Sequence, residues 1–270
     1  MRNQQELEEK EALRQKELNK AKTRLFTNIT HEFRTPLTVI SGMADLIEKE
    51  HGRWIPEGTN RIRNNSSLML RLVNQLLDIS KIEAKAMPVH IVKADIAAYT
   101  GLIIELHRSA AIEKNIALSY MNNLGNDGIM DFDPDIISKI FSNLLGNAIK
   151  FTPQNGTVSV SVNLEESGMM FLLRVADNGR GIPPDKVGHI FDPFYQAEDH
   201  SASGGGTGLG LALAQELAML VNGNISVESE PGKGLLLSAI QWEYGWCENH
   251  FLIPCKPQSR LSRASSHRSE

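Results

Sequence analysis

The sequence predicts an α+β multidomain fold in which a helical hairpin is followed by an α/β sandwich. From Leu25 to Ile40, apolar residues recur every three or four positions, and a second run with this spacing spans residues 62–79. After Pro88, short β-type runs alternate with helical segments. The change of pattern predicts two structural parts that meet near residue 86.

The first part is expected to be a hairpin of two long helices. Gly52 and Pro56 interrupt the helical pattern and predict the connecting loop. The apolar stripe has little else in residues 25–85 to pack against, so pairing with a second copy into a dimeric four-helix bundle is the expected way to bury it. Residues 1–24 mix charges of both signs with sparse leucines and predict an exposed helical lead-in.

The second part is expected to span residues 87–241, about the size of one domain. Its predicted strands are 89–92, 157–164, 169–176, 224–227 and 235–240, and its predicted helices lie near 95–114, 135–150 and 208–222. Residues 242–270 carry no assignable role, and their Ser-rich, basic end predicts disorder.

Composition excludes several classes of function. The formal net charge of -4 gives no general attraction to nucleic acid or to an anionic membrane. Cys247 and Cys255 form no CxxC pair, so neither a disulfide framework nor a zinc site is expected, and a reducing compartment fits best. No run approaches the roughly 18 apolar residues of a membrane span, so no membrane contact is expected within this chain.

The stretch FTNITHEFRTPLT at residues 26–38 holds a histidine beside a glutamate. At about 100° per residue, His31 falls nearly opposite the apolar stripe and is expected to face solvent, with Thr35 on the same face. Glu32 is adjacent enough to accept a proton from the imidazole. A zinc helix would need a second histidine at position 35. Pro36 should bend the helix. Alone, this stretch is equally compatible with a functional site and with an ordinary exposed helix surface.

The stretch FSNLLGNAIKFT at residues 141–152 predicts a helix with a distinct polar face. Asn143, Asn147 and Lys150 fall within roughly 60° of one another on a helical wheel. Two amides and an ammonium can hold a hydrated divalent cation and phosphate oxygens. The competing interpretation is the ordinary polar face of an amphipathic helix.

Two glycine-rich stretches follow. In VADNGRGIPP, Asp177 can accept a hydrogen bond from an exocyclic amine, and Gly179 and Gly181 let the backbone approach a flat ligand. In SGGGTGLGLAL, a glycine run precedes a helix whose first amides can cradle phosphate. Between them, IFDPFYQ forms an aromatic island in a predicted mobile lid at residues 182–206. Each stretch alone is equally compatible with a plain turn.

Together, HEFRTPLT, NLLGNAIKFT, DNGRGIP, FDPFYQ and GGTGLGLAL resemble, in order, the H, N, G1, F and G2 boxes of two-component sensor histidine kinases. The resemblance runs from about Leu18 to Gly234. It implies a HisKA-type dimerisation and phosphotransfer domain at 25–86 and an ATP-binding domain of the Bergerat (GHKL) type at 87–241. It also implies the cytoplasmic core of a larger bacterial sensor or hybrid kinase; anchoring of the full-length protein in the inner membrane stays open.

The resemblance implies ATP-dependent autophosphorylation and transfer of the phosphoryl group to an aspartate of a response-regulator receiver domain. His31 would be the phosphoacceptor, Glu32 its base and Thr35 the residue for phosphatase activity toward the regulator. ATP and Mg²⁺ are the implied cofactors. Asn147 would coordinate Mg²⁺ with help from Asn143, Lys150 would contact phosphate, and Asp177 would receive the adenine amine. The other implied nucleotide-binding residues are Phe151, Gly179, Gly181, Ile182, Phe191, Phe194, Gly204, Gly205, Gly206, Thr207, Gly208, Leu209 and Gly210.

Two alternatives compete with the kinase. GHKL ATPases and chaperones resemble the second part, but they carry a water-activating glutamate where this chain has Asn143, and an amide cannot serve as that general base. A dimeric interaction module that only binds nucleotide is the other alternative; the catalytic residues are all present, which favours the kinase.

Overall fold

The computed structural model describes residues 2–50, 54–125, 128–164, 170–196, 207–232 and 234–243. They divide into two compact units. The first comprises Met1–Pro88, Gly181–Leu220 and Ser229–Pro231, and the second comprises Val89–Arg180, Val221–Glu228 and Gly232–Glu270. The predicted domain boundaries at residues 24, 86 and 241 stay predictions.

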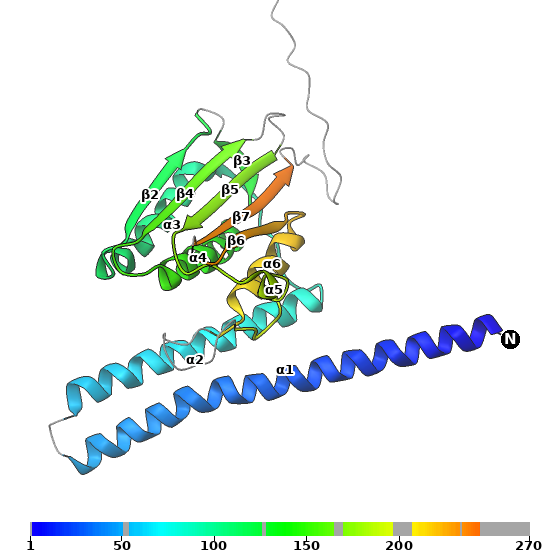
Figure 1. The fold of residues 1–270 in the computed structure, drawn as a ribbon, viewed down its shortest axis with the longest axis horizontal. Coiled ribbons are helices and arrows are strands. Elements are labelled where there is room, and N and C mark those ends of the chain that lie inside the picture. Colours follow the sequence, from blue (N-terminus) through cyan, green and yellow to red (C-terminus); the bar gives the residue numbers. More distant parts are fainter. Residues whose placement is uncertain are drawn as a thin grey trace, which may run out of the picture. The chain divides into compact units, whose positions relative to one another are not determined.

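Two long helices, α1 (Arg2–Lys49) and α2 (Ile55–Glu83), form the predicted hairpin of the first unit (Figure 1). Helix α1 continues through Pro36, and the predicted bend there stays a prediction. The loop is shorter than predicted, because Pro56 lies in the first turn of α2. Proline is tolerated there, since the amide that it lacks would have no partner within the helix.

The predicted apolar seam lies between the two helices. Leu72 is buried at 1% exposure, and the other seam residues of α2 are half-buried: Ile62, Met69, Leu76 and Ile79. Near the loop the helices approach closely at Gly58, where an added Cβ would lie 2.7 Å from Ile47 Cδ1. The hairpin therefore closes around one apolar seam.

A five-stranded sheet in the order β2-β4-β5-β7-β6 dominates the second unit. Strand β2 (Ala117–Asn122) runs parallel to β4 (Thr157–Leu164), whereas β4 pairs antiparallel with β5 (Met170–Asp177), and β5 with β7 (Gly234–Glu243). Strand β6 (Ile225–Glu230) forms the other edge. A two-stranded sheet pairs β1 (Val92–Asp95) with β3 (Ile129–Phe132).

Helices α3 (Ile96–Glu113) and α4 (Pro134–Phe151) pack against each other on one face of this sheet (Figure 1). The sheet contributes Val158, Val160 and Val162, which alternate along β4 and are fully buried. The N-cap of α4 is Asp133, whose carboxylate accepts hydrogen bonds from the amides of the next turn. This buried core fixes the position of α4, the helix with the predicted polar face.

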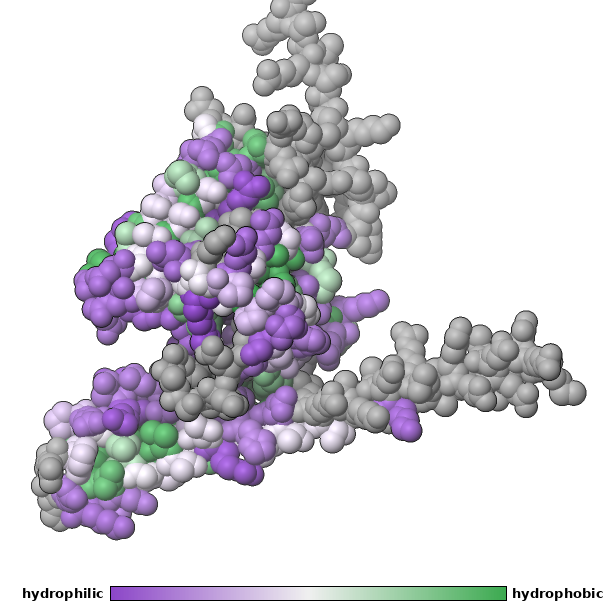
Figure 2. Space-filling view, viewed as in Figure 1, coloured by the Kyte–Doolittle hydropathy of each residue, from purple (hydrophilic) through white to green (hydrophobic). Residues whose placement is uncertain are grey.

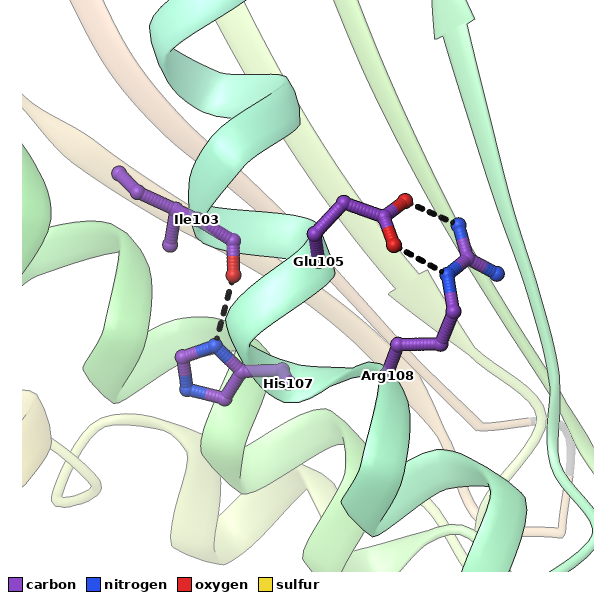
Figure 3. A network of polar contacts seen from close by, with 4 residues as sticks. All are labelled: Ile103, Glu105, His107 and Arg108. Carbon is purple, nitrogen blue, oxygen red and sulfur yellow. Dashed lines mark hydrogen bonds and ion pairs between the residues drawn. The ribbon is translucent and has the colours of Figure 1, made fainter.

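The outer face of α3 is exposed and carries charged side chains beside apolar ones such as Leu102 and Leu106. Figure 3 shows Glu105 and Arg108 joined by two hydrogen bonds of 2.7 and 2.6 Å, while His107 Nδ1 lies 2.9 Å from the carbonyl oxygen of Ile103. The guanidinium lowers the pKa of the Glu105 carboxyl. The side chains of Arg108 and Glu105 are 45% and 59% exposed, so this pair contributes little to stability.

One predicted strand needs correction, and two observed strands were not predicted. The run at 89–92 is not a strand apart from Val92, because β1 begins there and pairs with β3. Strands β2 and β3 were not predicted, since both are short and carry polar residues such as Asp131. Trp242, to which the sequence assigned no role, lies in β7 opposite Phe171. The strand predicted at 157–164 is confirmed, whereas residues 244–270 lie outside the described part.

The remaining elements are the four-residue helix α5 (Pro184–Val187) and α6 (Gly210–Leu220), both in the first unit. In the part of the chain that the structure describes, no helix is long and apolar enough to cross a membrane.

Candidate functional site

His31 lies on α1 and is exposed, as its position opposite the apolar stripe predicts. Thr35 is exposed one turn further along, and its Oγ1 donates a hydrogen bond to the carbonyl oxygen of His31 at 3.3 Å. Glu32 is half-buried beside them. An exposed imidazole next to a carboxylate can act as a nucleophile toward a large substrate, because no neighbouring core restricts the approach.

The predicted polar face of α4 is confirmed. Asn143, Asn147 and Lys150 are partly exposed, while the apolar residues between them are buried: Ile140, Phe141, Leu144, Leu145 and Ile149. Asn143 Nδ2 donates to the carbonyl oxygen of Lys139 at 2.8 Å. Among the described residues, no group of three His, Cys, Asp or Glu could hold a metal ion. A divalent cation at α4 would therefore be held by amide oxygens together with ligand phosphates and water.

Lys114 holds the end of α4. Its Nζ donates to the carbonyl oxygens of Ile149 at 3.0 Å and Lys150 at 2.7 Å, and it lies 3.5 Å from that of Thr152. The last carbonyls of a helix lack partners within it and carry partial negative charge, so an ammonium stabilises them. Sequence reasoning missed Lys114, because no local pattern links it to a helix that ends 37 residues later.

The turn after β5 packs against this same helix end. Asp177 Oδ1 accepts a hydrogen bond from the Gly179 amide at 2.8 Å. A Cβ at Gly179 would lie 2.7 Å from Asp177 Oδ1 and 2.7 Å from the carbonyl oxygen of Phe151, so only glycine fits. Asn178 Oδ1 accepts from the Thr157 amide at 2.7 Å, which fixes the turn to β4. The structure thus brings Asp177 and Gly179 next to the end of α4.

Phe151 lies at the centre of a cationic cluster. Phe151 is 37% exposed; Lys150 Nζ lies 4.8 Å from the ring centroid and Arg180 Cζ lies 5.0 Å from it. The predicted site residues of this stretch are Asp177, Gly179, Gly181 and Ile182, and Arg180 is not among them. Its position in DNGRGIP was the available signal.

In the first unit, the aromatic island and the second glycine-rich stretch are joined. The Phe194 amide donates to the carbonyl oxygen of Gly208 at 2.9 Å. Gly208 has a φ of +64°, and a Cβ there would lie 2.6 Å from Phe194 Cα. Leu209 is buried, and its amide donates to Thr207 Oγ1 at 3.2 Å just before α6 begins at Gly210.

The other predicted positions of this unit are only partly described. Gly181 has a φ of +68°, and the Ile182 amide donates to Ser229 Oγ at 2.8 Å. Phe191 is half-buried. Three predicted residues, Gly204, Gly205 and Gly206, and the end of the predicted lid lie outside the described residues.

Two family models match the chain. The model of the His Kinase A (phospho-acceptor) domain matches residues 21–85, which include His31. The model of the histidine kinase-, DNA gyrase B- and HSP90-like ATPase matches residues 132–240, which include α4 and the turn at Asp177.

Curated proteins similar to the chain are sensor histidine kinases. TmoS from Ectopseudomonas mendocina is 35% identical over 82% of this chain and 23% of its own length. RcsC from Escherichia coli K12 is 33% identical over 80% of this chain and 23% of its own length. WalK from Bacillus subtilis is 30% identical over 83% of this chain and 37% of its own length. The chain thus spans 23% to 37% of the length of these three relatives.

Solved structures with a similar fold include three histidine kinases. The Acinetobacter baumannii kinase AdeS matches with a TM-score of 0.62 at 20% identity, over 79% of this chain and 98% of that one. ShkA, solved in complex with AMPPNP, matches with a TM-score of 0.59 at 28% identity, over 81% of this chain and 46% of that one. ThkA, solved in complex with the response regulator TrrA, matches with a TM-score of 0.61 at 18% identity, over 86% of this chain and 66% of that one.

Proposed function

The chain belongs to the two-component sensor histidine kinases, and from this we propose that it phosphorylates its own His31 with ATP and then passes the phosphoryl group to an aspartate of a response regulator. The observation that carries the proposal is the exposed His31 within the segment that matches the phospho-acceptor model. The second match, to an ATPase of the histidine kinase type, supports ATP as the phosphoryl donor.

In the proposed reaction, one nitrogen of neutral His31 attacks the γ-phosphorus of ATP. The new nitrogen–phosphorus bond forms as the bond to the bridging oxygen breaks, and ADP leaves. The other ring nitrogen then carries a proton that the neighbouring Glu32 carboxylate accepts. The exposure of His31 supports this role, because a nucleotide bound to another part of the protein has to reach the imidazole.

The polar face of α4 is proposed to bind the nucleotide phosphates. Asn147, assisted by Asn143, would hold Mg²⁺, and Lys150 would contact a phosphate. When bound, Mg²⁺ would neutralise phosphate charge that otherwise resists a nucleophile. An amide at Asn143 leaves no general base for water at this position, which favours transfer to protein over ATP hydrolysis.

The turn at Asp177 is proposed to bind the base, with the carboxylate accepting from the adenine amine. The close packing of Gly179 against the carbonyl oxygen of Phe151 supports this placement, because it holds the turn next to the end of α4. The remaining proposed nucleotide-binding residues follow from the family: Phe151, Gly181, Ile182, Phe191, Phe194, Gly204, Gly205, Gly206, Thr207, Gly208, Leu209 and Gly210.

The hairpin is proposed to form a homodimer through residues 25–86, as a four-helix bundle. Among the hairpin residues whose exposure the structure describes, five large apolar ones are at least 40% exposed in the single chain: Leu37, Ile55, Leu70, Val73 and Leu77. Figure 2 shows hydrophobic residues on the hairpin surface among hydrophilic ones. A second hairpin would cover them.

A receiver domain is proposed to dock on the exposed face of His31. ThkA, whose fold is similar, was solved in complex with a response regulator. Thr35 shares the face of His31, which supports a role in positioning water when the regulator is dephosphorylated. Because the relatives are several times longer than this chain, we place it as the cytoplasmic core of a larger sensor or hybrid kinase.

Incubation with γ-labelled ATP and Mg²⁺ tests the phosphoacceptor. Acid-labile, alkali-stable label is expected on the wild-type chain and on the control His90→Gln, whose side chain is exposed elsewhere. The label should be absent from His31→Gln. Label that persists on His31→Gln would refute the assignment.

A second test separates kinase from phosphatase activity. Thr35→Ala should keep autophosphorylation and slow the removal of phosphate from a cognate regulator. Thr38→Ala is the matched control, because its exposed hydroxyl makes the same kind of bond to the preceding turn, to the carbonyl oxygen of Arg34 at 2.9 Å. Loss of both activities in Thr35→Ala would indicate a structural role.

A further inference from the structure

Arg180 contacts the proposed nucleotide-binding region, but no motif assigns it a role there. Its guanidinium carbon lies 5.0 Å from the ring centroid of Phe151, within the range of a cation–π interaction. Arg180 is exposed, and Phe151 is 37% exposed. The two residues therefore lie next to each other where a ligand can reach them.

The backbone holds these two groups together. The carbonyl oxygen of Arg180 accepts a hydrogen bond from the Gly232 amide at 2.8 Å. The preceding residue, Gly179, packs directly against the carbonyl oxygen of Phe151. On the other side, Lys114 binds the carbonyl oxygens at the end of α4. The backbones of Arg180 and Phe151 are therefore held next to each other, which places the guanidinium within reach of the ring.

The chemistry of the surface matches a purine base. A guanidinium is planar and stacks on aromatic rings and bases alike. Asp177, the proposed acceptor for the adenine amine, lies three residues before Arg180 on the same turn. Lys150 Nζ lies 4.8 Å from the same ring centroid, so positive charge surrounds the surface and favours an electron-rich base over a cationic ligand.

We propose that Arg180 and Phe151 together form a stacking platform for the purine base of the nucleotide. This inference rests on the proposed nucleotide site and adds a residue that contributes to affinity through the base and not through the phosphates. Lys150, by contrast, acts on the phosphates.

The test compares Arg180→Gln with Arg180→Lys and with the control Arg174→Gln, an exposed arginine on β5. Dissociation constants for ATP, ADP and adenosine are measured on the full chain by displacement of a fluorescent ATP analogue. Arg180→Gln is expected to weaken all three ligands by a similar factor, about fivefold to tenfold, because stacking on the base is common to them. Arg180→Lys should weaken them nearly as much, since an ammonium is not flat.

Three results would overturn the platform. If the loss of affinity in Arg180→Gln grew from adenosine to ATP, Arg180 would contact the phosphates and not the base. Full affinity in Arg180→Lys would show that only the charge of the side chain matters. Full affinity in Arg180→Gln would show that the cation–π pair does not contribute to nucleotide binding. If the wild-type chain bound no ATP, the proposed function would fail as well. Thermal unfolding without nucleotide shows whether each variant is folded.

Discussion

Helices α2 and α4 differ sharply in how much of their apolar surface the single chain buries. In α4, eight of 18 residues are buried, and they form one continuous face toward the sheet. In α2, two of 29 residues are buried, namely Gly58 and Leu72. Helix α4 thus completes its apolar face within one chain, whereas α2 leaves large apolar side chains exposed.

The exposed apolar residues of α2 have a helical spacing. Leu70, Val73 and Leu77 are 65%, 40% and 52% exposed and stand at i, i+3 and i+7 on one face. Helix α3 also exposes two leucines, Leu102 at 64% and Leu106 at 79%. Exposure alone therefore does not distinguish the two regions, and the comparison has to be tested by substitution.

The largest expected effect is the loss of the dimer in Leu70→Glu. A two-fold interface contains each substituted residue twice, so two carboxylates would enter the apolar interface between the two hairpins. We expect the dissociation constant of the dimer to rise by about 100-fold, which corresponds to about 2.7 kcal/mol. Sedimentation equilibrium measures it.

Leu106→Glu is the matched control, since it places the same charge on an exposed leucine of α3 and should leave the dimer intact. If Leu106→Glu dissociated the dimer and Leu70→Glu did not, the dimer interface would lie on the second unit and not on the hairpin.

What the sequence predicts well in this molecule is local. The exposure of His31 and the polar face of Asn143, Asn147 and Lys150 follow from spacing within a single helix, because the helical period fixes which residues share a face. The buried alternation of β4 follows in the same way from the period of a strand.

What the sequence does not predict is contact between distant segments. Lys114 and Arg180 reach the end of α4 only because α3 and the turn after β5 pack there. Strands β2 and β3 are too short to carry a clear alternation, and they are defined by pairing with β4 and β1. The contacts of Lys114 and Arg180 with the end of α4 therefore could not be predicted without the fold.

A smaller effect is expected from Lys114→Met within the second unit. The variant removes a charged donor from the carbonyl oxygens of Ile149 and Lys150, so the free energy of unfolding should fall by about 2 kcal/mol. Because Lys150 and Phe151 lie on that last turn, affinity for ATP should fall several-fold. Urea unfolding and nucleotide titration measure the two quantities.

The control for Lys114 is Lys93→Met, which removes an exposed charge from β1. Lys114→Arg should restore much of the affinity, because a guanidinium can also donate to several carbonyls. The dimer should persist in all three variants. A dimer that dissociated in Lys114→Met would show that the two regions are not independent.

The smallest expected effect is a pH dependence that belongs to the second unit alone. Tyr120 Oη donates to the carbonyl oxygen of Ala97 at 2.8 Å and lies 2.9 Å from Oγ1 of the fully buried Thr100. Burial raises the pKa of Tyr120 above its usual value near 10. The folded state therefore holds this proton more tightly than the unfolded state. The contribution of Tyr120 to the free energy of unfolding is complete below about pH 10 and is lost as pH rises through the raised pKa.

In urea unfolding between pH 8 and 11, the difference in the free energy of unfolding between wild type and Tyr120→Phe should shrink above pH 10. Residues 1–88 contain no tyrosine, so wild type and Tyr120→Phe should show the same pH dependence of dimer dissociation in sedimentation; a difference between the two would contradict the independence of the two regions.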